Sequence, residues 1–302
     1  MQNNKKIYFF ILLTGLLTGF SSCTNVQTNN KSNQENKTDK LPDSSGVNIG
    51  NNERVFFLIP APGEILERFH NSDVQYNPGI LNSPDNKDKY LGSKAQSLNL
   101  GVYIADMAYS ALFERSTETV DYLEAIQSLG NEAGISSSIY ESLPLRSKVN
   151  AGKMDSLLSI SNEAFNNMKE FLENGGKESM IARISTGAYI ESMFIGLQSM
   201  NKFDLNSHIP ELITDMKYPM DNLLAMARNV ITSENDSSLF QSINQIGIIF
   251  DEMETRNSKT QISQEQTGKI TISGGEKLRM NVSDFEKLKK TVTEIRMGMV
   301  EY

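Results

Sequence analysis

The sequence feature that most constrains the fold is the segment 97–115, which has the pattern of a helix that is apolar on almost every side. Apolar residues repeat at the spacing of one helix face, at Leu98, Val102, Ala105, Ala108 and Leu112. Other apolar residues widen this face, namely Leu100, Ile104, Met107, Ala111 and Phe113. A helix of this kind in a globular protein is buried among other helices. We therefore expect a core helix that starts near Asp88 and ends at Arg115.

A narrow polar stripe interrupts this apolar surface. It consists of Asn99, Tyr103, Asp106 and Ser110, which are four, three and four residues apart. A buried carboxylate destabilises a protein unless it is paired and hydrogen-bonded. The stripe therefore predicts that a second helix supplies polar partners.

The segment 177–200 is the predicted partner helix, because it is also strongly apolar. Arg183, Gly187 and Glu191 are four residues apart and share one face. We expect Arg183 to pair with Asp106, and Glu191 to accept a hydrogen bond from a tyrosine hydroxyl. Gly101 and Gly187 would let the two backbones approach each other closely.

The polar residues on these two helices admit two interpretations. They form either a satisfied structural network or the lining of a pocket for a small ligand, and catalysis by Asp106 and Glu191 is a special case of the second. The candidate residues are Asn99, Tyr103, Asp106, Arg183, Tyr189 and Glu191.

The rest of the body also has mainly helical patterns. Further helices are predicted at 63–70, 116–133, 153–173, 208–230 with a kink or break at Pro219, 237–255 and 283–300. Ser116 is the expected N-cap of one helix, and the segments 138–141 and 283–286 have capping-box spacing. Only 269–282 looks like a β-hairpin, with its turn at Gly274 and Gly275. The predicted fold is all-α, an irregular multi-helix bundle with one small β-hairpin near the C-terminus.

The N-terminus has the pattern of an export signal. Lys5 and Lys6 precede an apolar stretch at 7–17, which is too short to span a bilayer as a helix. Phe20, Ser21 and Ser22 then lead to Cys23, the only cysteine in the chain. This sequence resembles the lipobox of bacterial lipoproteins, although these prefer Leu at the position of Phe20. The resemblance implies that residues 1–22 are removed and that Cys23 is acylated and becomes the membrane anchor.

Residues 24–52 are predicted to form a disordered tether between the acylated Cys23 and a helical domain at 53–302. The tether is rich in Asn, Ser, Thr and Lys and has almost no apolar residues that could build a core. No acidic cluster follows Cys23. In lipoproteins of this kind such clusters tend to direct surface export, so we expect an outer-membrane anchor with the body facing the periplasm.

Net charge and cysteine content exclude several classes of function. The formal charge is −8, and removal of Lys5 and Lys6 with the signal leaves −10, which does not suit a nucleic-acid partner. One cysteine excludes an intramolecular disulfide and a cysteine-based zinc site. The two histidines, His70 and His208, are isolated. We therefore expect neither a metal nor another cofactor.

Two segments of the helical body resemble sequence patterns of a known group of proteins. The chain reads SLNLGVYIADMAY at 97–109 and GAYIE at 187–191. These segments resemble the patterns A-L-N-L-G-V-Y-x-A-D-L-A-Y and G-G-W-[IV]-E of a group of secreted or lipid-anchored helical proteins from Bacteroidota, and the similarity extends roughly over 54–255. The group has no assigned activity, so the resemblance implies no catalytic residues.

The segments that come near a nucleophile or phosphate-binding motif are incomplete. Ser199 and Lys202 have the Ser-x-x-Lys spacing of penicillin-binding enzymes, but the companion motifs are missing. The segment 273–277 lacks the pattern of a phosphate-binding loop. We therefore predict a non-catalytic binding or scaffold protein with an envelope protein as partner. The alternatives are a periplasmic receptor for a small ligand bound between the buried helices and, third, an enzyme.

Overall fold

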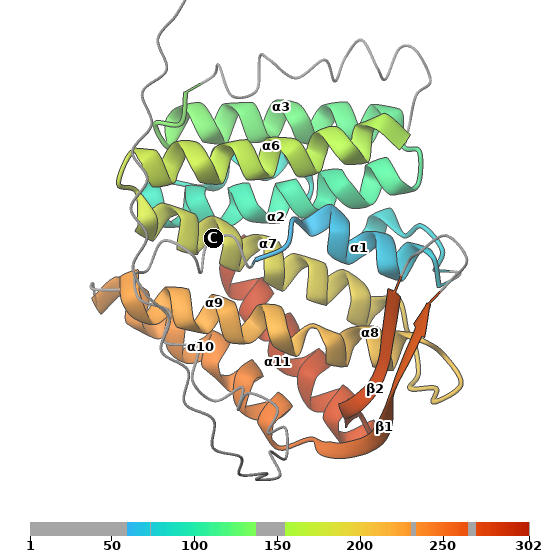
Figure 1. The fold of residues 1–302 in the computed structure, drawn as a ribbon. Helices are drawn as coiled ribbons and strands as arrows, with labels where there is room; N and C mark the ends of the chain where they lie inside the picture. The colour runs from blue at the N-terminus through green and yellow to red at the C-terminus, as the bar shows by residue number, and fades with distance from the viewer. Residues whose placement is uncertain (1–58, 73, 137–154, 231–233, 265–269, 302) are drawn as a thin grey trace, which may run out of the picture. The chain divides into compact units, whose positions relative to one another are not determined.

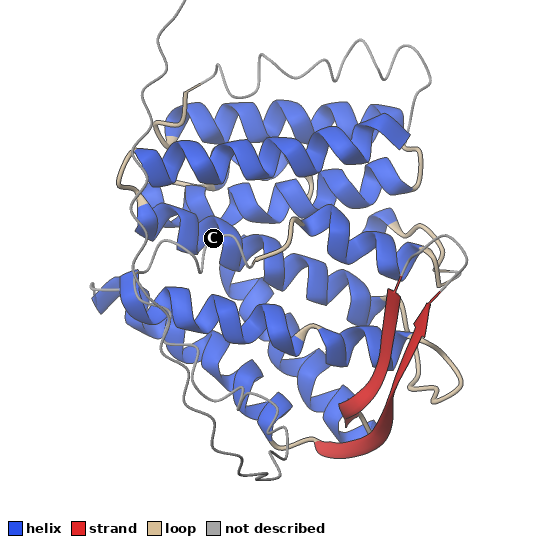
Figure 2. Cartoon of the chain, viewed as in Figure 1, coloured by secondary structure: helices blue, strands red, loops and turns tan. Residues whose placement is uncertain are grey.

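The computed structural model describes residues 59–72, 74–136, 155–230, 234–264 and 270–301. Within these ranges the chain folds into helices and one two-stranded antiparallel sheet (Figures 1 and 2). This confirms the predicted all-α class with a small hairpin near the C-terminus. The export signal, Cys23, the tether and the capping box at 138–141 lie outside the described residues.

Most of the helices occur where the apolar spacing predicts them. They are α1 (Pro62–His70), α2 (Ser93–Leu112), α3 (Ser116–Glu132), α6 (Asp155–Asn174), α7 (Glu178–Gln198), α8 (Ile209–Asp215), α9 (Lys217–Val230), α10 (Glu234–Asp251) and α11 (Val282–Val300). Two short 3₁₀ helices, η3 (Pro78–Ile80) and η4 (Pro84–Lys89), precede α2. None of the described helices is both long and apolar enough to cross a membrane.

The helix α2 lies at the centre of the bundle, and α7 packs along it, as the sequence predicts. A Cβ atom at Gly101 would lie 2.0 Å from the carbonyl oxygen of Ile184, and one at Gly187 would lie 2.0 Å from that of Leu98. The two backbones are therefore in direct contact at these glycines. Figure 1 shows α2 and α7 with α3 and α6 on one side and α9, α10 and α11 on the other.

Two predicted helix starts are wrong. The helix α2 begins at Ser93 rather than near Asp88, because Gly92 has a positive φ of 82° and the residues before it form η4. The helix α3 includes Ser116 as its first residue, and Arg115 is its N-cap without a side-chain hydrogen bond. In the turn between α2 and α3, Glu114 has a positive φ of 58°.

The predicted break near Pro219 is confirmed. The helix α8 ends at Asp215 and α9 starts at Lys217, so Pro219 lies in the first turn of α9, where a missing N–H is tolerated. The carbonyl oxygen of Met216, between the two helices, accepts hydrogen bonds from the N–H of Met220 at 3.1 Å and from the hydroxyl of Tyr189 at 2.8 Å.

The predicted position of the hairpin turn is wrong. Strand β1 (Glu254–Gln264) pairs with β2 (Ile270–Arg279), so the strand begins where the sequence predicts the end of a helix. Gly275 lies within β2 opposite Ser258, with a positive φ of 89°, next to a register shift between Ser258 and Gln261. Its conformational freedom serves this irregularity in the pairing rather than a tight turn.

The last helix starts with a different capping box from the predicted one. The side chain of Asn281 accepts a hydrogen bond from the backbone N–H of Asp284 at 3.1 Å, and the carboxylate of Asp284 accepts one from the N–H of Asn281 at 3.0 Å. The pair at Ser283 and Glu286 is therefore not the cap. Asn281 is an equally good capping residue two positions earlier, and the helix begins directly after it.

Candidate functional site

Three ionisable side chains from distant parts of the chain meet in the core. Asp106 of α2 and Glu191 of α7 are both fully buried. Arg296 of α11 binds Glu191 with two hydrogen bonds, from Nε to Oε2 at 2.9 Å and from Nη2 to Oε1 at 3.0 Å. Its Nη2 also donates to the carbonyl oxygen of Ile80 at 3.1 Å. Glu191 therefore has the paired and hydrogen-bonded environment that a buried carboxylate needs.

Asp106 lies beside this pair without a cation of its own. Its Oδ2 accepts a hydrogen bond from the backbone N–H of Asn82 at 3.2 Å, while Oδ1 accepts none from the described residues. Burial and the negative charge of Glu191 raise the pKa of Asp106 well above its ordinary value. In its protonated form, Asp106 can donate a hydrogen bond to Glu191.

The guanidinium group of Arg296 is held in place by its surroundings. Its Cζ lies 4.5 Å above the centre of the Phe194 ring, an arrangement that favours the cation. Burial alone would lower the pKa of Arg296, but the neighbouring carboxylate of Glu191 outweighs this effect and the pKa is raised. Arg296 therefore stays charged and fixes the end of α11 against α7.

Neutral side chains extend the cluster to the last turn of α11. Asn99 donates through Nδ2 to the carbonyl oxygen of Met299 at 2.8 Å, and the hydroxyl of Tyr90 donates to that of Val300 at 3.3 Å. Asn82 donates to the Tyr90 hydroxyl at 2.9 Å. Because the last carbonyls of a helix lack partners within the helix, these contacts complete the end of α11.

The other predicted site residues are bonded elsewhere. The hydroxyl of Tyr103 donates to the carbonyl oxygen of Ser83 at 2.9 Å, and that of Tyr189 donates to Met216 as described above. Arg183 binds Asp236 of α10, with Nε 3.1 Å from Oδ1.

Two predicted pairings are therefore wrong. Arg183 does not neutralise Asp106, and Glu191 accepts from Arg296 rather than from a tyrosine. Arg183 and Glu191 share a face but are eight residues apart, which is about 12 Å along the helix. Of these two residues, Glu191 lies close to Asp106, while Arg183 contacts Asp236 of α10.

Sequence reasoning missed Asn82, Tyr90, Asp236 and Arg296. Arg296 lies in an amphipathic helix rich in Lys and Glu, where a single arginine looks like one more solvated charge. Its apolar neighbours Ile295 and Met297 are a signal that this residue is buried. In addition, the buried carboxylates of Asp106 and Glu191 require at least one cation nearby.

The cluster leaves no room for a ligand between α2 and α7, because the two backbones touch at Gly101 and Gly187. Asn99, Asp106 and Glu191 are each fully buried. Within the described residues no group of three His, Cys, Asp or Glu side chains could hold a metal ion. The cluster can thus fix three helices relative to one another, but it has no exposed acid, base or nucleophile.

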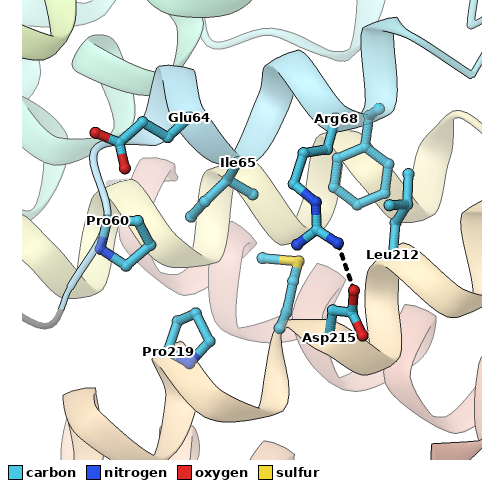
Figure 3. A pocket seen from close by; sticks show the side chains of 9 residues that line it. Pro60, Glu64, Ile65, Arg68, Leu212, Asp215 and Pro219 are labelled. Carbon is cyan, nitrogen blue, oxygen red and sulfur yellow. Dashed lines mark hydrogen bonds and ion pairs between the residues drawn. The ribbon is translucent and has the colours of Figure 1, made fainter. Parts of the chain in front are cut away.

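The hollows that the structure describes lie at the surface. One of about 190 Å³ lies between α1 and the α8–α9 break, with Ile65, Leu212 and Pro219 around it and an ion pair between Arg68 and Asp215 at its side (Figure 3). A second, of about 280 Å³, lies between α6 and the start of α1. There, Lys169 donates to the carbonyl oxygen of Ile59 at 3.0 Å, and burial lowers the pKa of its amine. A third hollow, of about 590 Å³, lies beside the ends of α1 and α7.

Comparison of the chain with protein-family models, with curated proteins and with solved structures finds no match. A function must therefore be inferred from the residues themselves.

Proposed function

We propose that the chain is a lipid-anchored cell-envelope protein whose helical body is a non-catalytic binding or scaffold module. One observation carries the second half of this proposal. Asp106 and Glu191, the two carboxylates most suggestive of acid–base chemistry, have no exposed surface. Their hydrogen bonds go to Arg296 and to the backbone of Asn82.

A general acid or base must come within about 3 Å of the proton that it transfers, directly or through one water. Asp106 is fully buried beneath the backbone of Asn82 and beside the contact between α2 and α7, so a substrate cannot reach it in this structure. Bidentate pairing with Arg296 also fixes the orientation of the Glu191 carboxylate. These features support a role in holding the fold together rather than in chemistry.

The anchor half of the proposal rests on the sequence. Lys5 and Lys6, the short apolar stretch at 7–17 and the single Cys23 are in the order that lipoprotein processing requires. More than one acyl chain on Cys23 would attach the protein stably, since one chain alone binds a membrane only marginally. We place the anchor in the outer membrane, with the body facing the periplasm and available to an envelope protein partner.

A receptor for a small ligand is the second candidate function. The groove of about 590 Å³ favours it, because this volume lies within the range of about 300–1,000 Å³ that is usual for ligand sites. The site would then lie at the ends of α1 and α7, and not between the buried helices as the sequence suggests.

Cell fractionation tests the anchor. Cys23→Ala should move the full-length protein from the membrane pellet to the soluble fraction and abolish incorporation of labelled fatty acid. Ser22→Ala is the matched control, because it keeps a small residue before the cysteine and should stay in the pellet. A Cys23→Ala protein that remained in the pellet would show that the anchor is not a lipid on this residue.

The binding role is tested by site-specific crosslinking in intact cells, followed by purification in detergent. The proposal predicts crosslinks from exposed positions on the body to a defined envelope component. Turnover of a substrate that Asp106→Asn abolishes without unfolding the protein would overturn the non-catalytic assignment.

A further inference from the structure

The groove beside the ends of α1 and α7 has a composition that differs from that of the chain as a whole. Its lining comes from the segment after α1, from α2, from the end of α7 and from the residues before α8. Charged residues make up 22% of the chain, yet the described lining contains none. Among these described residues a charged ligand would meet no opposite charge to offset the loss of its hydration. The described part of the lining therefore suits an uncharged ligand.

Four carboxamide side chains surround this groove, which we call the amide groove. They are Gln75, Asn77, Gln198 and Asn201. Each carboxamide offers two N–H donors and one acceptor oxygen. Asn77 uses its oxygen to accept from the N–H of Gly79 at 3.0 Å. The side chains of Gln75, Gln198 and Asn201 form no hydrogen bond with any described residue, so their capacity is available to a ligand.

One wall of the amide groove is held rigidly. The backbone N–H of Asn77 donates to the hydroxyl of Tyr109 at 3.1 Å, and that hydroxyl donates to the carbonyl oxygen of Gln75 at 3.2 Å. The ring of Tyr76 stacks on that of Tyr109 with 5.3 Å between their centres. These contacts fix the segment that carries Gln75 and Asn77 to the central helix α2. Groups positioned in this way before binding lose less entropy when a ligand arrives.

The groove also has an apolar component. Val74, Ile80 and Ile209 line it together with Tyr76 and Tyr109. A ligand that matches this surface must present C–H groups to the aliphatic side chains and many hydroxyl groups to the carboxamides. Carbohydrates have this combination, because a sugar ring carries hydroxyls at its rim and C–H groups on its faces.

We propose that the amide groove binds a neutral oligosaccharide. This inference rests on the proposed function, since it assigns a ligand class to the binding module. Gln198 and Asn201 on one wall and Gln75 and Asn77 on the other would hydrogen-bond the hydroxyls, while the aliphatic side chains contact the ring faces. Because the described lining offers no cation, we expect uronic-acid and sulfated glycans to bind less well than neutral ones.

The test uses the full-length protein purified in detergent. Isothermal titration calorimetry is carried out with neutral hexasaccharides of α-glucan, β-glucan, xylan and mannan, and with hexagalacturonate as the acidic probe. The inference predicts that at least one neutral probe binds and that the acidic probe does not. The double variant Gln198→Ala/Asn201→Ala should weaken that binding about tenfold or more, given about two- to tenfold for each lost hydrogen bond.

Gln245→Ala is the matched control, because it removes an exposed carboxamide from α10 away from the groove and should leave binding unchanged. The double variant should melt at the same temperature as the natural protein, because neither side chain hydrogen-bonds a described residue. Failure of every neutral probe, preference for the acidic probe, or equal binding by the double variant would each overturn the inference. Membrane attachment through Cys23 and crosslinking to an envelope component would be unaffected by these outcomes, so a failure here is distinct from a failure of the proposed function.

Discussion

The Cα of Gly101 in α2 faces the backbone of α7 so closely that a Cβ atom at this position would lie 2.0 Å from the carbonyl oxygen of Ile184. Gly187 faces the carbonyl oxygen of Leu98 in the same manner. This double contact sets the distance between the two central helices. It also brings the polar side chains of the two helices, including Asp106 and Glu191, together in the buried core.

Substitution of either glycine should therefore separate the helices. Gly101→Ala and Gly187→Ala should each lower the free energy of unfolding by about 1–3 kcal/mol or more, because the new methyl group overlaps backbone atoms that cannot move alone. Chemical denaturation measures this loss. Gly298→Ala is the control in α11, where no atom lies within 4 Å of a new Cβ, so it should have no cost or a small gain. Equal effects at all three glycines would contradict the close contact.

The stability of the protein should depend on the protonation of Asp106. Burial and the charge of Glu191 raise its pKa above the ordinary 3.8, so the folded protein keeps a proton that the unfolded chain releases. The contribution of Asp106 is fully present below pH 3.8 and is lost as the pH rises through the raised pKa of the folded state. The free energy of unfolding should therefore fall with increasing pH across this window, relative to a variant without the carboxyl group.

Asp106→Asn supplies that reference, because an amide of the same size does not ionise. Denaturation curves of both proteins, recorded over a series of pH values, give the difference in their free energies of unfolding. As the pH rises, this difference should change in favour of the amide variant, at no more than about 1.4 kcal/mol per pH unit. A difference that is constant over the whole series would show that Asp106 has an ordinary pKa.

Asp106 and Arg183 should act independently of each other. Arg183 binds Asp236 on α10, whereas Asp106 contacts Asn82 and lies near Glu191. In a double-mutant cycle, the effects of Asp106→Ala and Arg183→Ala should add to within about 0.5 kcal/mol. The cycle of Arg183→Ala with Asp236→Ala should instead show clear coupling. The opposite pattern would restore the pairing that the sequence suggests.

The cap of α11 is tested by two alanine substitutions. Asn281→Ala should reduce the free energy of unfolding by about 1 kcal/mol, because the N–H of Asp284 loses its acceptor. Ser283→Ala should have little effect, since Ser283 is exposed and its side chain is not the cap. Thermal melts of the two variants distinguish the observed cap from the predicted one, and a larger loss for Ser283→Ala would reverse the assignment.

Apolar periodicity predicts the helices well because burial of α2 and α7 leaves a strong signal over about twenty residues each. The glycines of the contact are also predictable, since small residues face each other where helices approach closely. The partners of the charged residues cannot be predicted in this way. Pairing depends on the position of each residue along the helix axis relative to the neighbouring helices, and not on the helix face alone. Arg183 shares a face with Glu191 but meets α10, while Arg296 comes from a helix 105 residues further along the chain. Strand β1 was missed because its polar residues show no alternation of apolar and polar positions.

The central claim is that the buried charges hold the fold together, and the most direct measurement is a double-mutant cycle on Glu191 and Arg296. Chemical denaturation gives the free energies of unfolding of the natural protein, Glu191→Ala, Arg296→Ala and the double variant. Each single substitution leaves an uncompensated charge in the core and should cost roughly 3–5 kcal/mol, while the double variant should lose clearly less than the sum. Single losses below about 0.5 kcal/mol that simply add would contradict the claim and would make Glu191 a candidate functional residue again.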